Sequence, residues 1–138
     1  MDVRMESTEG FGRQAEVWIA GNLLTVYDQF SSQRKPCPPG MLKDVKFAYK
    51  CDEGFTWEQV LRGNESRRKL LDPVRGSGYV GYGRIVSIMP VVVDFGLVEM
   101  EDARWTSDEQ LVGRYVRVPI DQLEIHRAHE PDWPEHVR

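Results

Sequence analysis

Basic and aromatic side chains recur close together in the middle of the 138-residue chain. Lys46 and Lys50 lie on one face of an alternating segment, and Tyr82 and Arg84 share a face of a later one. Proteins that bind single-stranded nucleic acid combine such a basic groove with aromatic rings on which bases stack. We therefore take Lys46, Lys50, Tyr82 and Arg84 as the candidate nucleic-acid face.

The charge of the chain is divided unevenly along the sequence. The segment from Arg34 to Arg84 has 11 basic and 6 acidic residues (11 − 6 = +5), and the segment from Val91 to Arg138 has 5 basic and 11 acidic (5 − 11 = −6). A net charge of −4 for the whole chain disfavours a dedicated duplex binder, because duplex affinity rests on neutralising phosphates. A solvated face with its own counter-charges is the competing interpretation of the basic middle segment.

The histidines are concentrated near the C-terminus, where carboxylates also accumulate. His126 and His129 are the candidate metal ligands, since imidazole and carboxylate groups bind zinc and similar ions. The sequence HRAHE does not match HExxH, and the prolines that follow disfavour a rigid site. We expect a solvated tail here and no resident metal or cofactor.

Other motifs give little support for catalysis. Residues 76–81 match GxGxxG, but a dinucleotide site needs a strand before the motif and a helix after it, and here that order is reversed. No serine lies in GxSxG. Glu99 and Glu101 alternate with apolar residues, which is typical of the wet face of a strand. An enzyme is therefore not the favoured interpretation.

The N-terminal sequence and the cysteines suggest a cytoplasmic protein. Residues 1–14 lack the basic start and apolar stretch of a secretory signal. Cys37 and Cys51 are too few for a disulfide framework and are expected to be free thiols. No apolar run reaches about 18 residues, so we expect no membrane span.

Most of the chain has the pattern of short strands. Residues 15–20 and 23–27 flank Gly21-Asn22, which predicts a β-hairpin, with one long strand bulged at Gly21 as the alternative. Period-two alternation predicts another strand over residues 45–51. Further strands are predicted at 79–89, 91–95, 98–101, 114–118 and 123–126.

One helical segment is predicted at about residues 57–71. Thr56 is a good N-cap, Gln59 completes a capping box, and Phe55 and Val60 are placed to form a hydrophobic staple. Gly63-Asn64 interrupts the pattern, so one strained helix and two short helices remain alternatives. Asp72-Pro73 ends the segment, because a residue before proline is pushed out of helical space.

The order of elements predicts one mainly β domain over residues 13–127, with a mobile N-terminal tail (1–12) and a C-terminal tail (128–138). Short connections and a single helical segment favour a small β-barrel.

The helix after about three strands resembles the oligonucleotide/oligosaccharide-binding (OB) fold. The stretch GRIVSIMPVVVDFGLVEME, within roughly Gly81 to Ile125, resembles the start of an S1-like RNA-binding barrel. The two resemblances start the barrel at different places, and an SH3-like barrel and an open β-sheet capped by the helix remain alternatives. The resemblances imply a small β-barrel.

The favoured function is a non-catalytic binding module for a protein partner or for a second copy of the chain. The alternatives are single-stranded nucleic-acid binding by an OB-like barrel and a small hydrolase or metal-dependent enzyme.

Overall fold

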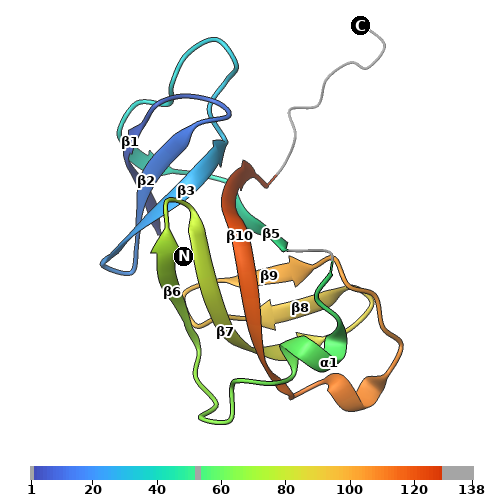
Figure 1. Ribbon diagram of the computed structural model, residues 1–138. Coiled ribbons are helices and arrows are strands. Elements are labelled where there is room, and N and C mark those ends of the chain that lie inside the picture. The colour runs from blue at the N-terminus through green and yellow to red at the C-terminus, as the bar shows by residue number, and fades with distance from the viewer. Residues whose placement is uncertain (1, 52–53, 129–138) are drawn as a thin grey trace, which may run out of the picture.

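The computed structural model describes residues 2–51 and 54–128, which form a mainly β fold (Figure 1). Ten strands belong to one sheet, accompanied by a single turn of α-helix and a short 3-10 turn. The prediction of a mainly β protein is confirmed. The sheet is not closed among the described residues, because its path runs from β4 to β9 without these two strands pairing. The predicted barrel is therefore not confirmed.

The N-terminal part contains β1 (Val3–Thr8), β2 (Gln14–Ile19), β3 (Asn22–Gln29) and the short β4 (Gly40–Leu42), in the order β4-β1-β2-β3. The predicted hairpin is β2–β3, in which Ile19 pairs with Asn22. The turn is therefore Ala20-Gly21, one residue earlier than expected, and both residues have positive φ (48° and 79°). This is the backbone that a tight primed turn requires.

Strand β1 lies where the sequence predicted a mobile tail, so that prediction is corrected for residues 3–8. The strand pairs with both β2 and β4. Val3 and Met5 face inward and are 1% and 0% exposed. Two apolar side chains at a spacing of two were a strand signal, although the polar residues around them obscured it.

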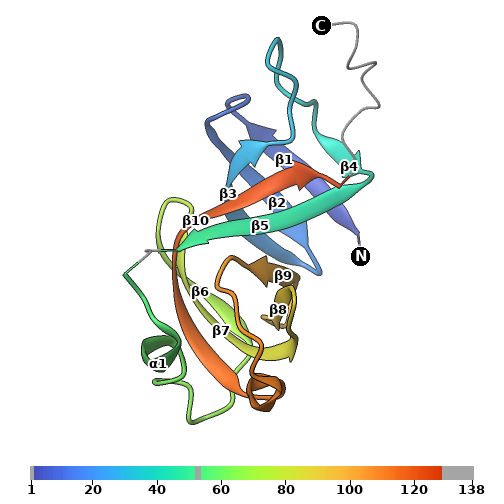
Figure 2. The same ribbon diagram turned by 90° about the vertical axis from the view of Figure 1, so that its right-hand side faces the viewer.

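The C-terminal part contains β6 (Leu70–Arg75), β7 (Gly78–Ser87), β8 (Val91–Asp94) and β9 (Glu99–Asp102). The long β10 (Tyr115–Arg127) joins this part to the N-terminal strands (Figures 1 and 2). Its first half pairs with β7, and its second half lies between β5 (Val45–Cys51) and β3. β10 is therefore the strand that holds the two parts together.

The helical segment is much shorter than predicted. The capping box is present, with Gln59 N–H donating to Thr56 Oγ1 and Thr56 N–H donating to the Gln59 side chain. However, α1 spans only Trp57–Val60. Gly63 adopts a positive φ of 91°, which ends the helical path, and residues 70–75 pair with β7 instead. Pro73 fits there because β6 pairs along one side only.

Two glycines of β7 make room for the largest fully buried side chain. A Cβ at Gly81 would lie 2.6 Å from the ring of Phe95, and one at Gly83 would lie 2.6 Å from Val93. Phe95 is 0% exposed. These glycines therefore allow close packing of Phe95 and Val93 against β7.

No helix in the described ranges is both long enough and apolar enough to cross a membrane.

Candidate functional site

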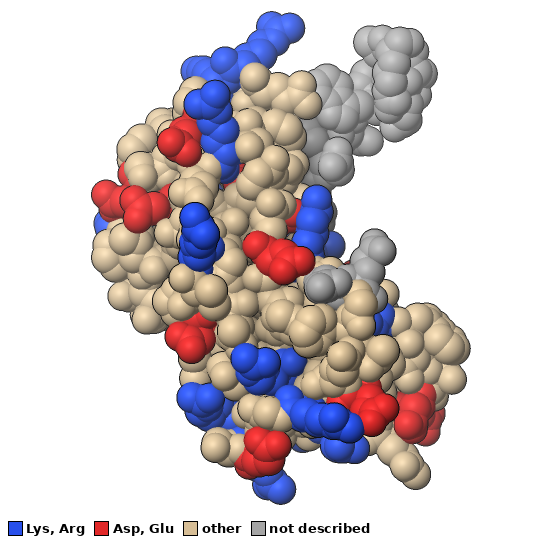
Figure 3. Space-filling view, viewed as in Figure 1, with Lys and Arg blue, Asp and Glu red and all other residues tan. Residues whose placement is uncertain are grey.

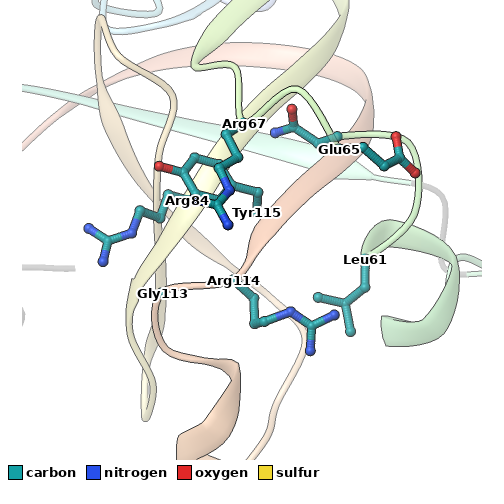
Figure 4. Close-up of a pocket in the computed structure, with 8 residues that line it drawn as sticks. Leu61, Glu65, Arg67, Arg84, Gly113, Arg114 and Tyr115 are labelled. Atoms are coloured by element: carbon teal, nitrogen blue, oxygen red, sulfur yellow. The ribbon is translucent and has the colours of Figure 1, made fainter.

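An open pocket lies where the segment after α1 meets the end of β7 and the start of β10 (Figure 4). Its volume is about 490 Å³, which is within the range of small-ligand sites. The lining is dominated by arginine, and we call it the arginine pocket: Leu61, Asn64, Glu65, Arg67, Arg84, Gly113, Arg114 and Tyr115.

The side chain of Asn64 holds the segment of residues 62–69 on the sheet. Asn64 is buried, and its amide donates hydrogen bonds of 3.0 Å to the carbonyl oxygens of Arg68 and Val116. Its carbonyl oxygen accepts the Arg68 N–H at 2.8 Å. Because one side chain joins this segment to β10, the arginines that follow are presented from a fixed backbone.

Arginine and tyrosine alternate across β7 and β10 beneath this segment. Arg84 pairs with Tyr115, and Tyr82 pairs with Arg117. The Arg67 guanidinium carbon lies 6.0 Å from the centre of the Tyr115 ring, and that of Arg68 lies 4.2 Å from the centre of the Tyr82 ring. Each tyrosine is thus covered by a cation from the segment after α1.

Few of the described carboxylates lie near the pocket arginines to neutralise their positive charge. Among the described residues, none of Arg67, Arg84 and Arg114 forms an ion pair. Glu65 is the single carboxylate in the lining, and it accepts the N–H of Gly63 at 3.2 Å.

Asp94 is the cross-strand partner of Arg84. The Asp94 carboxylate pairs with Lys69 at 2.9 Å. Burial raises the pKa of Asp94, but hydrogen bonds from Lys69 and Gly96 and the nearby charges of Lys69 and Arg84 outweigh it, so its pKa is lowered. Lys69 is therefore the ion-pair partner of this carboxylate, and the charge of Arg84 acts on it from across the strand pair. Figure 3 shows Lys and Arg side chains on the lower part of the molecule, with Asp and Glu side chains among them.

The structure separates the four residues predicted to form a nucleic-acid face. Lys50 pairs with Gln122 of β10, whereas Arg84 pairs with Tyr115 at the other end of that strand. At about 3.3 Å per residue, these positions are roughly 20 Å apart along β10.

The four residues also differ in how accessible their side chains are to a ligand. Lys46 is exposed on β5, whereas Lys50 lies 3.8 Å from the buried carboxylate of Glu124. Tyr82 is only 8% exposed beneath Arg68, so its ring is not open to a base. Arg84 alone contributes to the arginine pocket.

Sequence analysis missed Arg67, Arg114 and Tyr115 as partners of Arg84. Arg67 belongs to the charged run Arg67-Arg68-Lys69, which was assigned to a helix. Strand pairing brings Arg114 and Tyr115 to Arg84 from about 30 positions further along the sequence. The cluster at residues 67–69 was the local signal available; the rest depended on the sheet register.

The candidate metal ligands do not form a metal site in the described part of the chain. His126 lies 2.9 Å from Glu124, and His129 lies outside the described residues. No group of three His, Cys, Asp or Glu residues suited to a metal ion occurs within residues 2–51 and 54–128.

A second polar cluster links β5 to the end of β9. Tyr49 donates a hydrogen bond to Asp102, and Arg104 pairs with Asp102 at 2.6 Å and donates to the Cys51 sulfur at 2.6 Å. Burial raises the pKa of Cys51, although Arg104 acts against this. The thiol is therefore kept protonated, and this cluster is suited to structure rather than to nucleophilic chemistry. Cys51 and Cys37 are not joined by a disulfide.

No protein-family model matches the chain, and neither the curated proteins nor the solved structures contain a match to it.

Proposed function

We propose that this protein is a non-catalytic binding module that recognises an extended anionic partner at the arginine pocket. The observation that carries the proposal is the set of exposed arginines Arg67, Arg84 and Arg114, which have no ion pair among the described residues. Exposed arginines near a protein surface attract anions and bind them in bidentate geometry.

The chemistry of the lining favours binding over catalysis. Glu65 is exposed and its carboxylate is hydrogen-bonded to backbone, so it is poorly placed as a general acid or base. The lining contains no serine, cysteine or histidine to act as a nucleophile or proton shuttle. Arginine and tyrosine at neutral pH supply charge and hydrogen-bond donors instead.

We also propose that β5, β10, β7, β8 and β9 form a partly open, OB-like barrel. These strands are neighbours in that order, and β9 lies against β5 without pairing to it. The Tyr49–Asp102–Arg104–Cys51 cluster bridges this gap with side chains. A partly open five-stranded barrel is characteristic of the OB fold, whose members are binding domains.

The test is retention on a heparin column, whose sulfated polymer probes for polyanion binding without assuming a particular partner. We expect the protein to be retained despite its net charge of −4, and the double variant Arg84→Gln/Arg114→Gln to elute at clearly lower salt. The matched control is Arg13→Gln/Arg34→Gln, which removes the same charge from exposed arginines outside the pocket. Equal elution of the two double variants would refute the proposal.

A second candidate function, self-association, has its own observation. Trp105 is 72% exposed and Met89 is 59% exposed, and both line one shallow pocket at the end of β9. Exposed apolar groups of this size mark protein interaction sites when they form a patch. Sedimentation velocity at increasing concentration tests this candidate: a dimer that Trp105→Ser abolishes supports it, and a monomer at every concentration excludes it.

A further inference from the structure

We infer that the anionic partner of the arginine pocket is single-stranded nucleic acid. This inference rests on the proposed function and names the partner of the same site.

The arginines are arranged for a chain of anions rather than for one compact anion. Arg84 and Arg114 point to different sides of the pocket, and Arg67 lies over the Tyr115 ring between them (Figure 4). They come from three separate parts of the chain: the segment after α1, strand β7 and the residue just before β10. Successive phosphates of a flexible strand can reach such separated cations in turn.

Tyr115 supplies the aromatic surface that a nucleic-acid site needs in addition to charge. Its ring lies beside Arg84 across the strand pair and is half-buried, whereas that of Tyr82 is buried. The Arg67 guanidinium is 6.0 Å from the centre of the Tyr115 ring, compared with 4.2 Å between Arg68 and Tyr82, so part of the Tyr115 ring stays accessible. Bases stack on tyrosine rings and on guanidinium planes without strong sequence preference. The pocket therefore combines a stacking platform with phosphate-binding cations.

Among the described residues, strand β7, which carries Arg84, has no free edge to which a peptide partner could add as a strand. Strand β7 pairs with β10 on one side and with β8 and β6 on the other. The Val116 carbonyl oxygen on the outer side of β10 accepts a hydrogen bond from Asn64. Leu61 is the single aliphatic side chain of the lining, so an acidic peptide would also lack apolar anchor sites.

Duplex DNA suits the site less well than a single strand. Recognition in the major groove requires an α-helix or a two-stranded ribbon that projects from the protein. Here α1 has four residues, and the arginines line a concave surface. A flexible single strand can follow that surface more closely than a rigid duplex can.

The experiment compares three fluorescently labelled ligands in anisotropy titrations with the full chain. The ligands are a single-stranded 12-mer of mixed sequence, the corresponding 12-base-pair duplex, and a 12-residue polyglutamate peptide, each at several salt concentrations. We expect the single strand to bind tightest, with a slope of log K against log salt of about −2, as neutralising three phosphates gives for single strands.

Variants connect the binding to the pocket. Arg84→Gln/Arg114→Gln should reduce the slope to roughly −0.7, because one phosphate contact remains. Tyr115→Leu should weaken single-strand binding by about fivefold to a hundredfold through lost stacking, with the salt slope unchanged. The control Arg13→Gln/Arg34→Gln should behave like the unaltered protein.

Each other outcome has a defined meaning. Tighter binding of polyglutamate or of the duplex overturns the inference while leaving an anionic partner in place. Single-strand binding whose salt slope is unchanged by the pocket variant also overturns it. Failure of all three ligands to bind, together with no retention on heparin, overturns the proposed function itself.

Discussion

Asp28 shows how one buried carboxylate can organise a connection between strands. It is 0% exposed and accepts hydrogen bonds from the backbone N–H groups of Phe30 and Ser31 and from the hydroxyl groups of Thr8 and Ser31. Burial raises the pKa of Asp28, but these hydrogen bonds outweigh it, so the pKa is lowered. A lowered pKa means that the charged form stabilises the fold at pH values above about 3.9, the pKa of an unfolded aspartate.

The stabilisation by Asp28 should therefore be present at neutral pH and disappear as the pH falls through the lowered pKa of the folded state. We expect Asp28→Asn to decrease the free energy of unfolding at pH 7 by about 1–3 kcal/mol, since it removes hydrogen bonds to a charged group. The variant should also lose less stability than the unaltered protein between pH 5 and 3. Urea unfolding across this range measures both effects. Asp72→Asn, an exposed change of the same type, is the control and should have little effect at pH 7.

The packing of strand β7 requires a residue without a side chain at Gly81. A Cβ there would lie 2.6 Å from Phe95 and 2.9 Å from Ile120. We expect Gly81→Ala to decrease stability by about 1–3 kcal/mol through overpacking. In the Gly81→Ala background, Phe95→Leu should cost less than it does alone, because the smaller side chain relieves the clash. Chemical denaturation of the four proteins of this double-mutant cycle gives the coupling, and strictly additive costs would contradict the packing argument.

The burial of β1 leads to a prediction about the stability contributed by the N-terminal residues. Met5 is 0% exposed in β1, so Met5→Ala should cost about 2–5 kcal/mol as a large-to-small core substitution. Arg4→Gln changes an exposed neighbour and should cost no more than about 0.5 kcal/mol. Thermal melts followed by circular dichroism compare the two. Equal stability of both variants would restore the view that this segment is a dispensable tail.

At the scale of the whole molecule, the cluster around Arg104 joins β5 to the end of β9. These two strands do not pair with each other. The Asp102 side chain is 2% exposed, so removing the guanidinium leaves a buried carboxylate without its charged partner. We expect Arg104→Ala to decrease stability by about 3–5 kcal/mol. Arg114→Ala, an exposed arginine outside this cluster, should cost far less. The measurement is guanidinium unfolding, and equal midpoints for the two variants would show that the cluster does not hold the strands together.

Local chemistry made several features of the fold predictable. The β2–β3 hairpin follows from two β-rich runs around a turn that tolerates positive φ, and β5 follows from the alternation of residues 45–51. The capping box at Thr56 and Gln59 was also correct. Each of these signals lies within a few residues of the feature that it predicts, because it reflects backbone preference and side-chain alternation.

Tertiary structure decided the features that depend on residues far apart in the sequence. After Gly63 ends the helical path, the charged segment 62–69 is held against β10 by Asn64, whose hydrogen bond to Val116 local propensity cannot include. The register of β7 with β10 places Tyr115 beside Arg84, and it separates Arg84 from Lys46 and Lys50. The sequence by itself determined that the protein is mainly β and which residues are basic. Only the pairing of distant strands decided which arginines form one pocket, because that register depends on the packing of the whole core.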